Sequence, residues 1–185
     1  MIDVSLRPEL PHPDLGALFD EHFDYVWGAL SRLGVRPSDL EDQVHEVFLR
    51  VHRRLADYDT SRPMKPWLFG FVFRVASDHR RLVRHRVEVI GARAEAIASA
   101  PSAQEGMEAD EERTLVEEAL DAVDLDRCAV LIMHDVDDVP IPAVAQVLGI
   151  PVGTAYSRLR AARADLAAAV TRLRKTRSRK NRGEP

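Results

Sequence analysis

One stretch, residues 139–163, constrains the fold more than any other part of the chain. Its first half places Ile141, Val144, Ala145 and Leu148 at helical spacing, and Gly149 follows where a left-handed residue often ends a helix. A second apolar period begins at Val152. The stretch therefore predicts two short helices joined by a tight turn, which is a helix-turn-helix pattern.

The second helix of this pattern is predicted to have two different faces. At about 100° per residue, its apolar residues fall on one side: Val152, Ala155, Leu159, Ala162 and Leu166. Polar and basic residues lie opposite or beside them: Thr154, Tyr156, Ser157, Arg158, Arg160 and Arg163. An arginine-rich face of this width fits a DNA major groove. Helix pairs joined through glycine also occur in all-α domains that bind no DNA, so this stretch alone does not establish DNA binding.

The distribution of charge favours nucleic acid as a partner. The net charge of −4 is the sum of opposing blocks: −6 for residues 1–60, +6 for 61–93, −12 for 94–140 and +8 for 141–185. Two basic blocks, each after an acidic one, indicate a protein that meets a polyanion at two places and protein elsewhere. The acidic blocks also predict weak binding to free DNA, because they repel the phosphates.

The composition is that of a globular protein. Of the 185 residues, 30% are charged and 6% are aromatic. Cys128 is the single cysteine, which excludes an internal disulfide, and its apolar neighbours predict a buried thiol. The N-terminus lacks a basic start with an apolar run, and no stretch reaches the roughly 20 apolar residues of a membrane span. We therefore expect a cytoplasmic protein with no membrane insertion.

The first third of the chain predicts two amphipathic helices. Asp14 can cap a helix that runs to Gly34. Pro37 and the capping-box pair Ser38 and Glu41 start a second helix, acidic in its first half and basic in its second. That order suits the helix dipole, so simple stabilisation would also explain it.

A third predicted helix, opened by Pro66, has an unusual order of side chains. Four aromatic rings come first, and arginines follow: Trp67, Phe69, Phe71 and Phe73, then Arg74, Arg80, Arg81, Arg84 and Arg86. Rings that stack on bases and guanidinium groups that bind phosphates are typical of a single-stranded nucleic-acid site. In the alternative, the rings pack in a small core and the arginines are solvated. We expect Trp67 and Phe71 in that core and leave Phe69 and Phe73 open.

The helical pattern fails after this helix and resumes later. Residues 93–111 are rich in Ala, Ser and Glu and include Pro101 and Gly106, which predicts a flexible linker. Helical spacing returns at Leu115 and continues into the helix-turn-helix, and the basic tail from Thr171 is expected to fray. The sequence thus predicts an all-α fold of two small helical bundles, residues 1–92 and 112–185, joined by the linker.

The motifs of common enzymes are missing from the sequence. It contains no glycine-rich phosphate loop, no HExxH, no GxSxG and no Cys/His metal spacing. We therefore expect no catalytic residue, metal ion or cofactor, and no small-molecule substrate.

The order of these parts resembles a known family. An acidic SDLEDQVHEVFLRVHRRL helix, an aromatic-then-basic WLFGFVFRVASDHRRLVR helix, a linker and a terminal LGIPVGTAYSRLRAAR helix-turn-helix are similar to bacterial RNA polymerase sigma factors of the extracytoplasmic-function (ECF) group. The resemblance covers residues 14–92 and 112–170. It implies a factor that binds core RNA polymerase through its clamp and flap and directs promoter-specific transcription initiation. An anti-sigma factor is a further partner that the resemblance implies.

The resemblance also implies roles for individual residues. Contacts to the polymerase clamp would come from the acidic helix: Asp39, Glu41, Asp42, Gln43, Glu46 and Phe48. Contacts to the melted promoter −10 element would come from the turn before the third helix and from that helix: Tyr58, Arg62, Lys65, Trp67, Arg74, Arg80, Arg81 and Arg84. The −35 element would be read as duplex by the helix-turn-helix residues Thr154, Tyr156, Ser157, Arg158, Arg160 and Arg163.

Some positions depart from the family pattern. Family members commonly carry Asn at position 74 and a basic residue at position 156, where this chain has Arg74 and Tyr156. Because base contacts set specificity, these changes imply an unusual promoter.

A second possible function stays open. The alternative is a dimeric helix-turn-helix regulator whose first domain binds a ligand or a protein.

Overall fold

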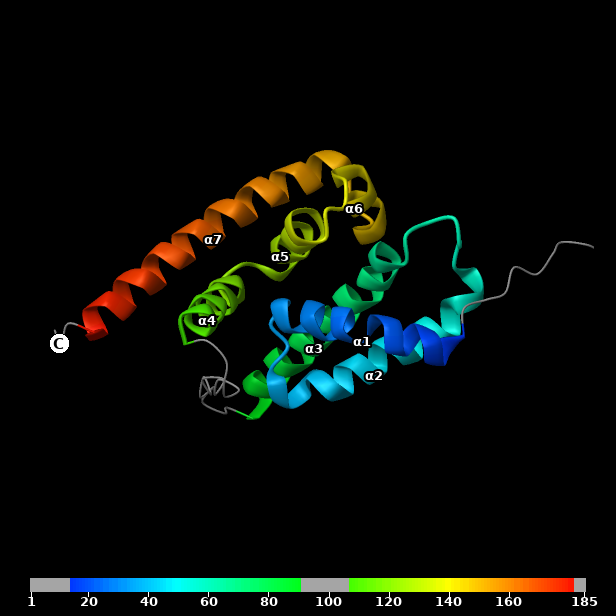
Figure 1. Cartoon of the computed structure of the whole chain (residues 1–185), viewed down its shortest axis with the longest axis horizontal. Helices are drawn as coiled ribbons and strands as arrows, with labels where there is room; N and C mark the ends of the chain where they lie inside the picture. The colour runs from blue at the N-terminus through cyan, green and yellow to red at the C-terminus, as the bar shows by residue number, and fades with distance from the viewer. Residues whose placement is uncertain (1–13, 91–106, 182–185) are drawn as a thin grey trace, which may run out of the picture.

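Every element of the described chain is a helix. The computed structural model describes residues 14–90 and 107–181 (Figure 1). The elements are, in order, α1 (Leu15–Arg32), α2 (Pro37–Arg54), η1 (Leu55–Asp57), α3 (Met64–Ile90), α4 (Met107–Asp121), α5 (Leu125–Leu131), η2 (Ile132–Val136), α6 (Ile141–Leu148) and α7 (Val152–Asn181). The prediction of an all-α fold in two helical parts, α1 to α3 and α4 to α7, is confirmed.

The helix ends follow local signals in the sequence. The Asp14 carboxylate accepts a hydrogen bond from the backbone N–H of Ala17 at 3.2 Å and begins α1. Pro37 opens α2 at a position where its missing N–H costs nothing. Gly34 and Gly149 end α1 and α6 with φ of 79° and 67°, a backbone region that strongly favours glycine. The predicted stop at Gly149 is therefore confirmed.

The first helical part encloses an apolar core with aromatic rings at its rim. Leu30, Val47, Leu68 and Phe69 are fully buried between α1, α2 and α3. Phe71 is also buried at 8% exposed, while Trp67 and Phe73 are half-buried against the cluster. The rings of the third helix therefore mostly complete the core, as the alternative interpretation expected.

The second helical part is built on the long helix α7. Its buried residues Ala155, Leu159 and Ala162 pack against α5 and α6. The helix continues to Asn181, and two ion pairs of 3.1 Å, Arg174 to Glu112 and Arg177 to Glu118, join its end to α4. The prediction that the tail frays from Thr171 is wrong up to Asn181, because these cations have acidic partners on α4.

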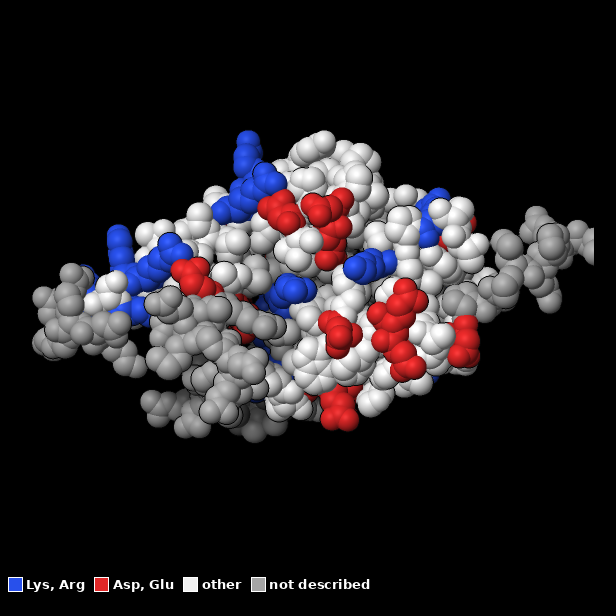
Figure 2. Space-filling view, in the orientation of Figure 1, with Lys and Arg blue, Asp and Glu red and all other residues white. Residues whose placement is uncertain are grey.

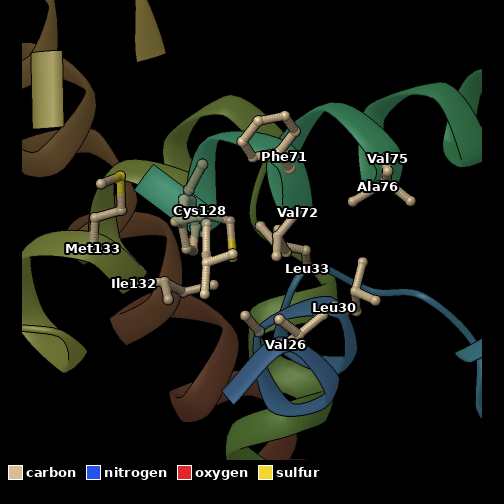
Figure 3. Packing of buried hydrophobic residues seen from close by; sticks show 14 of the residues in the cluster. Val26, Leu30, Leu33, Phe71, Val72, Val75, Ala76, Cys128, Ile132 and Met133 are labelled. Atoms are coloured by element: carbon tan, nitrogen blue, oxygen red, sulfur yellow. The ribbon is translucent and has the colours of Figure 1, made fainter. Parts of the chain in front are cut away.

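The two parts lie against each other and share one apolar cluster (Figures 1 and 3). α6 packs on α3, and α4 approaches α1. Residues 91–106, which include most of the predicted linker, lie outside the described residues. α4 begins at Met107, so the end of the predicted linker is helical.

Gly149 offers a test of the turn between α6 and α7. We expect Gly149→Ala to lower the free energy of unfolding by about 1 kcal/mol, because alanine would have to adopt a left-handed backbone conformation there. An added Cβ would touch no other group, so the cost comes from the backbone conformation alone. Urea denaturation measures this. Gly153→Ala is the matched control, since Gly153 is helical and equally uncrowded, and it should leave stability equal or slightly higher. Equal effects at both positions would contradict the role of Gly149.

Candidate nucleic-acid and polymerase interface

The face of α7 predicted to meet the major groove is displayed outward. Tyr156, Ser157 and Arg160 are exposed, and Tyr156 is 57% exposed despite its large ring. The opposite side of the helix is fixed by the buried Ala155 and Leu159. The Ser157 hydroxyl donates to the carbonyl of Thr154 at 2.9 Å, within the same helix. The arrangement therefore presents polar side chains on a rigid helix, as groove reading requires.

Two of the predicted −35 residues are engaged within the domain. Arg163 forms a bidentate pair with Asp135 at 2.6 and 2.9 Å, and Arg158 donates to Asp126 at 2.7 Å. The hydrogen bonds from Arg163 are the main reason that the pKa of the Asp135 carboxyl is lowered. Arg158 and Arg163 thus tie α7 to η2 and α5. Arg160 has no such partner among the described residues, so it is the arginine of this set that is free to meet a ligand.

The aromatic residues predicted for −10 binding form one contiguous stack. The ring of Trp67 lies 4.8 Å from the ring of Tyr58 and 4.8 Å from that of Phe71, and the Arg74 guanidinium lies 5.8 Å from the Phe71 ring. A groove of about 580 Å³ runs beside the stack, lined by Arg50, Arg53, Arg54, Asp57, Trp67, Gly70, Phe71, Arg74 and Val147. Cations and a half-exposed indole in one groove suit an unstacked strand.

Three arginines of α2 belong to this groove although the sequence did not single them out for binding. Arg50, Arg53 and Arg54 follow the acidic first half of α2, where the helix dipole was a sufficient explanation. Arg50 is held by Glu46 at 2.6 Å and by Asp78 at 3.0 Å, whereas Arg53 has no partner among the described residues. Their spacing along one helix, near the turn before α3, was the available signal.

The remaining predicted −10 residues do not share one surface. Arg80 packs against the turn at Gly34, while Arg81 is 84% exposed beside Asp78. Arg84 is exposed and lines a second, open groove of about 1070 Å³ between α3 and α5. Arg62 pairs with Asp59 at 3.2 Å, and Lys65 lies 5.5 Å from the Tyr25 ring. The structure therefore divides the set between the aromatic groove and the junction of the two helical parts.

The acidic helix offers a smaller surface than the full predicted set. Phe48 is 5% exposed and packs 4.7 Å from the Phe19 ring, so its side chain is not available to a partner. Asp39 turns toward α3, where its carboxylate lies 3.2 Å from His79. Glu41 and Asp42 are exposed, and Gln43 is half-buried. Figure 2 shows acidic side chains gathered over α1 and α2 and basic ones along α7.

The chemistry of a metal centre or a reactive thiol is not seen in the described residues. No group of three His, Cys, Asp or Glu side chains there is arranged to hold a metal ion. Cys128 is buried, and burial raises the pKa of its thiol to about 12. The prediction of a buried thiol is confirmed. None of the helices in the described ranges is long and apolar enough to cross a membrane.

The Arg163 pair gives a test with a pH dependence. At neutral pH we expect Arg163→Ala to lower the urea midpoint, because it removes the hydrogen bonds to Asp135. Arg160→Ala should leave the midpoint unchanged, because Arg160 has no partner among the described residues. An aspartate with a lowered pKa contributes stability above its unfolded pKa of about 4, and this contribution is lost as the pH falls through the lowered value. The difference between the two variants should therefore shrink below about pH 4. A difference that is constant with pH would contradict this.

Comparisons with known families match both helical parts. Residues 18–86 match sigma-70 region 2, and residues 113–166 match sigma-70 region 4. The ECF RNA polymerase sigma factor SigL of Mycobacterium tuberculosis is 32% identical over 145 residues, covering 77% of this chain and 81% of SigL. RNA polymerase sigma factor NccH of Alcaligenes xylosoxydans xylosoxydans is 28% identical over 157 residues, covering 83% of this chain and 84% of NccH.

Solved structures share the fold. The sigma factor RpoE of Bartonella quintana, solved in complex with the anti-sigma factor NepR, has a TM-score of 0.64 at 20% identity and covers 83% of this chain and 96% of RpoE. CnrH, solved with the cytosolic domain of CnrY, has a TM-score of 0.60 at 24% identity and covers 85% of this chain and 87% of CnrH. The expectations of a sigma factor and of a protein that is not an enzyme are therefore confirmed. The chain belongs to the ECF group of RNA polymerase sigma factors, non-catalytic initiation factors that recognise promoters through sigma-70 regions 2 and 4.

Proposed function

We propose that the two helical parts divide promoter recognition between them. α4 to α7 reads the −35 element as duplex, and α1 to α3 docks on core RNA polymerase and holds the melted −10 element. The observation that carries this proposal is the outward face of α7, where Arg160 and Tyr156 are exposed with no side-chain partner in residues 14–90 or 107–181, while the reverse side of the helix is buried. We place the protein in the cytoplasm with the polymerase.

The −35 contact is proposed to centre on Tyr156, Ser157 and Arg160. These three exposed residues lie near the N-terminus of α7, the end of a recognition helix that contacts base edges. Arginine can bond two acceptors of one guanine at once. Arg158 and Arg163 instead hold the angle of α7 through Asp126 and Asp135. Thr154 is half-buried and would position the start of the helix.

The −10 contact is proposed to lie in the groove beside Trp67. A flipped base would stack on the half-exposed indole or on Tyr58, and the exposed Arg53 and Arg74 would neutralise phosphates, while Arg54 is paired with Asp57 at 2.8 Å. Stacking and cation contacts of this kind can offset the few kcal/mol needed to take a base out of the duplex stack. Arg84 would add a phosphate contact farther along α3.

Polymerase docking is proposed to use the exposed carboxylates of α2. Glu41 and Asp42 face outward near the start of the helix, and Glu46 lies one turn further along, held by Arg50. An acidic patch of this kind suits a basic surface on the partner. We also propose that an anti-sigma factor restrains the chain, as structures of two similar proteins with CnrY and NepR suggest.

Reconstituted transcription tests the proposal. Purified chain should give defined start sites on genomic fragments when core polymerase is added, and weak DNA binding without it, because the acidic blocks repel phosphates. Double charge reversal at Glu41 and Asp42 should reduce polymerase binding, measured by co-elution. Reversal of Asp20 and Asp24, exposed carboxylates of α1, is the matched control. Symmetric high-affinity footprints without polymerase would instead support a dimeric regulator.

Alanine substitutions of two arginines should have different effects if Arg160 contacts a base and Arg84 contacts a phosphate. Arg160→Ala should weaken binding to the preferred −35 sequence by on the order of 1 to 3 kcal/mol and flatten the preference among sequences, because it removes a base contact. Arg84→Ala should weaken all promoters evenly and reduce the salt dependence, because it removes a phosphate contact. Polymerase holoenzyme binding to a panel of promoter variants at several salt concentrations measures both. Unchanged sequence preference in Arg160→Ala would refute the base contact.

A further inference from the structure

The two helical parts close on each other along an apolar seam. The seam joins α1 and α3 on one side to α5, η2 and α6 on the other. Figure 3 shows Cys128 and Ile132 lying among Val26, Leu33 and Val72. Each of these side chains is 2% exposed or less. Separating the parts would bring this apolar surface into water, which opposes opening.

A half-buried hydrogen bond crosses the seam beside the apolar contact. The Tyr25 hydroxyl on α1 donates to the Asp137 carboxylate at 2.7 Å. The turn η2 sets the position of Asp137, whose backbone N–H bonds the carbonyl of Ile132 at 3.0 Å. Burial, more than any other cause, raises the pKa of the Tyr25 phenol, which keeps its proton available for this bond. Tyr25 and Asp137 therefore form a polar contact between the two parts.

A second polar contact crosses the junction at Gly34. The Arg80 guanidinium of α3 and the Asp121 carboxylate of α4 both approach this glycine, and a Cβ added there would overlap Arg80 and lie 2.9 Å from Asp121 Oδ1. Arg80 draws the Asp121 pKa down against a larger effect of burial, which raises it. The glycine at position 34 leaves room for both charged groups beside this turn. Arg80 is therefore occupied at the junction instead of facing a DNA strand.

Closure also brings α6 onto the proposed −10 groove. Val147 of α6 lines that groove together with Trp67, Phe71 and Arg74. A Cβ added at Gly70 of α3 would lie 3.5 Å from Val147 Cγ1, which is ordinary contact distance. The helix that precedes the recognition helix therefore rests directly on the surface proposed for the single strand.

This arrangement is incompatible with holding both promoter elements. By their positions the −10 and −35 elements lie about 25 base pairs apart, or about 85 Å of duplex at 3.4 Å per pair. Tyr156 follows Val147 by nine residues, so the two are at most about 30 Å apart even along an extended chain. In the closed chain the −35 face thus lies far nearer to the −10 groove than the elements lie to each other.

We infer that the chain inhibits itself: its own second helical part closes on the first and must be released before both promoter elements can be held. The hydrogen bond from Tyr25 to Asp137 and the electrostatic attraction between Arg80 and Asp121 hold it closed. The closed contact stands on the geometry alone, and its inhibitory consequence rests on the proposed function. No other chain is needed for the closure.

Cys128 provides a native reporter of opening. It is the single cysteine of the chain and lies in the seam at 2% exposed, where its thiol meets the Arg32 carbonyl at 3.5 Å. A thiol reagent such as DTNB should therefore modify the native chain only when the seam opens. The urea dependence of the labelling rate should be shallower than that of global unfolding, because opening exposes less surface.

Two tyrosine variants test the latch with the same chemical change. Tyr25→Phe removes the hydroxyl that bonds Asp137, and we expect labelling of Cys128 about fivefold faster, the factor that corresponds to one net hydrogen bond. Tyr58→Phe removes a hydroxyl that bonds the Arg62 carbonyl within the first part, and it should label like the parent. Equal rates for parent and Tyr25→Phe, or a parent thiol as reactive as in the unfolded chain, would overturn the closed state.

A reversible crosslink tests the inhibitory consequence. With the native Cys128 retained, Arg32→Cys places a second thiol across the seam, because the Cys128 thiol already lies 3.5 Å from the Arg32 carbonyl and neither residue lines the −10 groove. The oxidised protein should lose most promoter-specific transcripts with core polymerase, and the same sample should regain them after reduction. Equal yields from both forms would overturn self-inhibition. Failure of the proposed function shows separately, as a parent that starts no transcripts while its thiol labelling is unaffected.

Discussion

The buried side of α7 is the constraint on which the rest of the second helical part depends. Ala155 and Ala162 are fully buried, so α7 approaches α5 closely and cannot rotate without exposing Leu159. With that side fixed, the helical period alone directs Tyr156 and Arg160 to solvent. The apolar residues thus determine where the polar ones point, although they touch no ligand themselves.

The charges of the protein divide into those that hold its structure and those left for partners. Arg158, Arg163, Arg174 and Arg177 are paired with carboxylates of α4, α5 and η2. Four acidic residues of the central block, Glu112, Glu118, Asp126 and Asp135, therefore pair with basic residues of the C-terminal block within the same domain. A count of arginines therefore overstates the surface available to DNA. Arg160, which has no partner in the described part of the chain, is a better candidate for a DNA contact than its paired neighbours.

The fold was largely predictable because its signals are local. Gly149, Pro37 and Asp14 mark helix ends, and the apolar period gives the buried faces. The types of residue in the site were predictable, but not which of them are exposed to a partner and which are buried or paired within the protein. The burial of Phe48 and the turning of Asp39 toward His79 depend on neighbours distant in sequence. The same holds for the helical tail, which needs Glu112 and Glu118 of α4, and for the seam between the two parts, since neither leaves a periodic pattern.

The length of α7 has a mechanical consequence. Its 30 residues form one uninterrupted helix that spans about 45 Å at 1.5 Å per residue. Since its N-terminal end is packed on α5 and its far end is joined to α4, the domain turns as a single rigid body. A rotation of only about 10° about the packed end would carry the far end through about 8 Å, for a rod of this length. The far end of α7 is cationic, with Arg172, Lys175 and Arg179 facing solvent. A small rotation of the domain would therefore move these positive charges over a large distance.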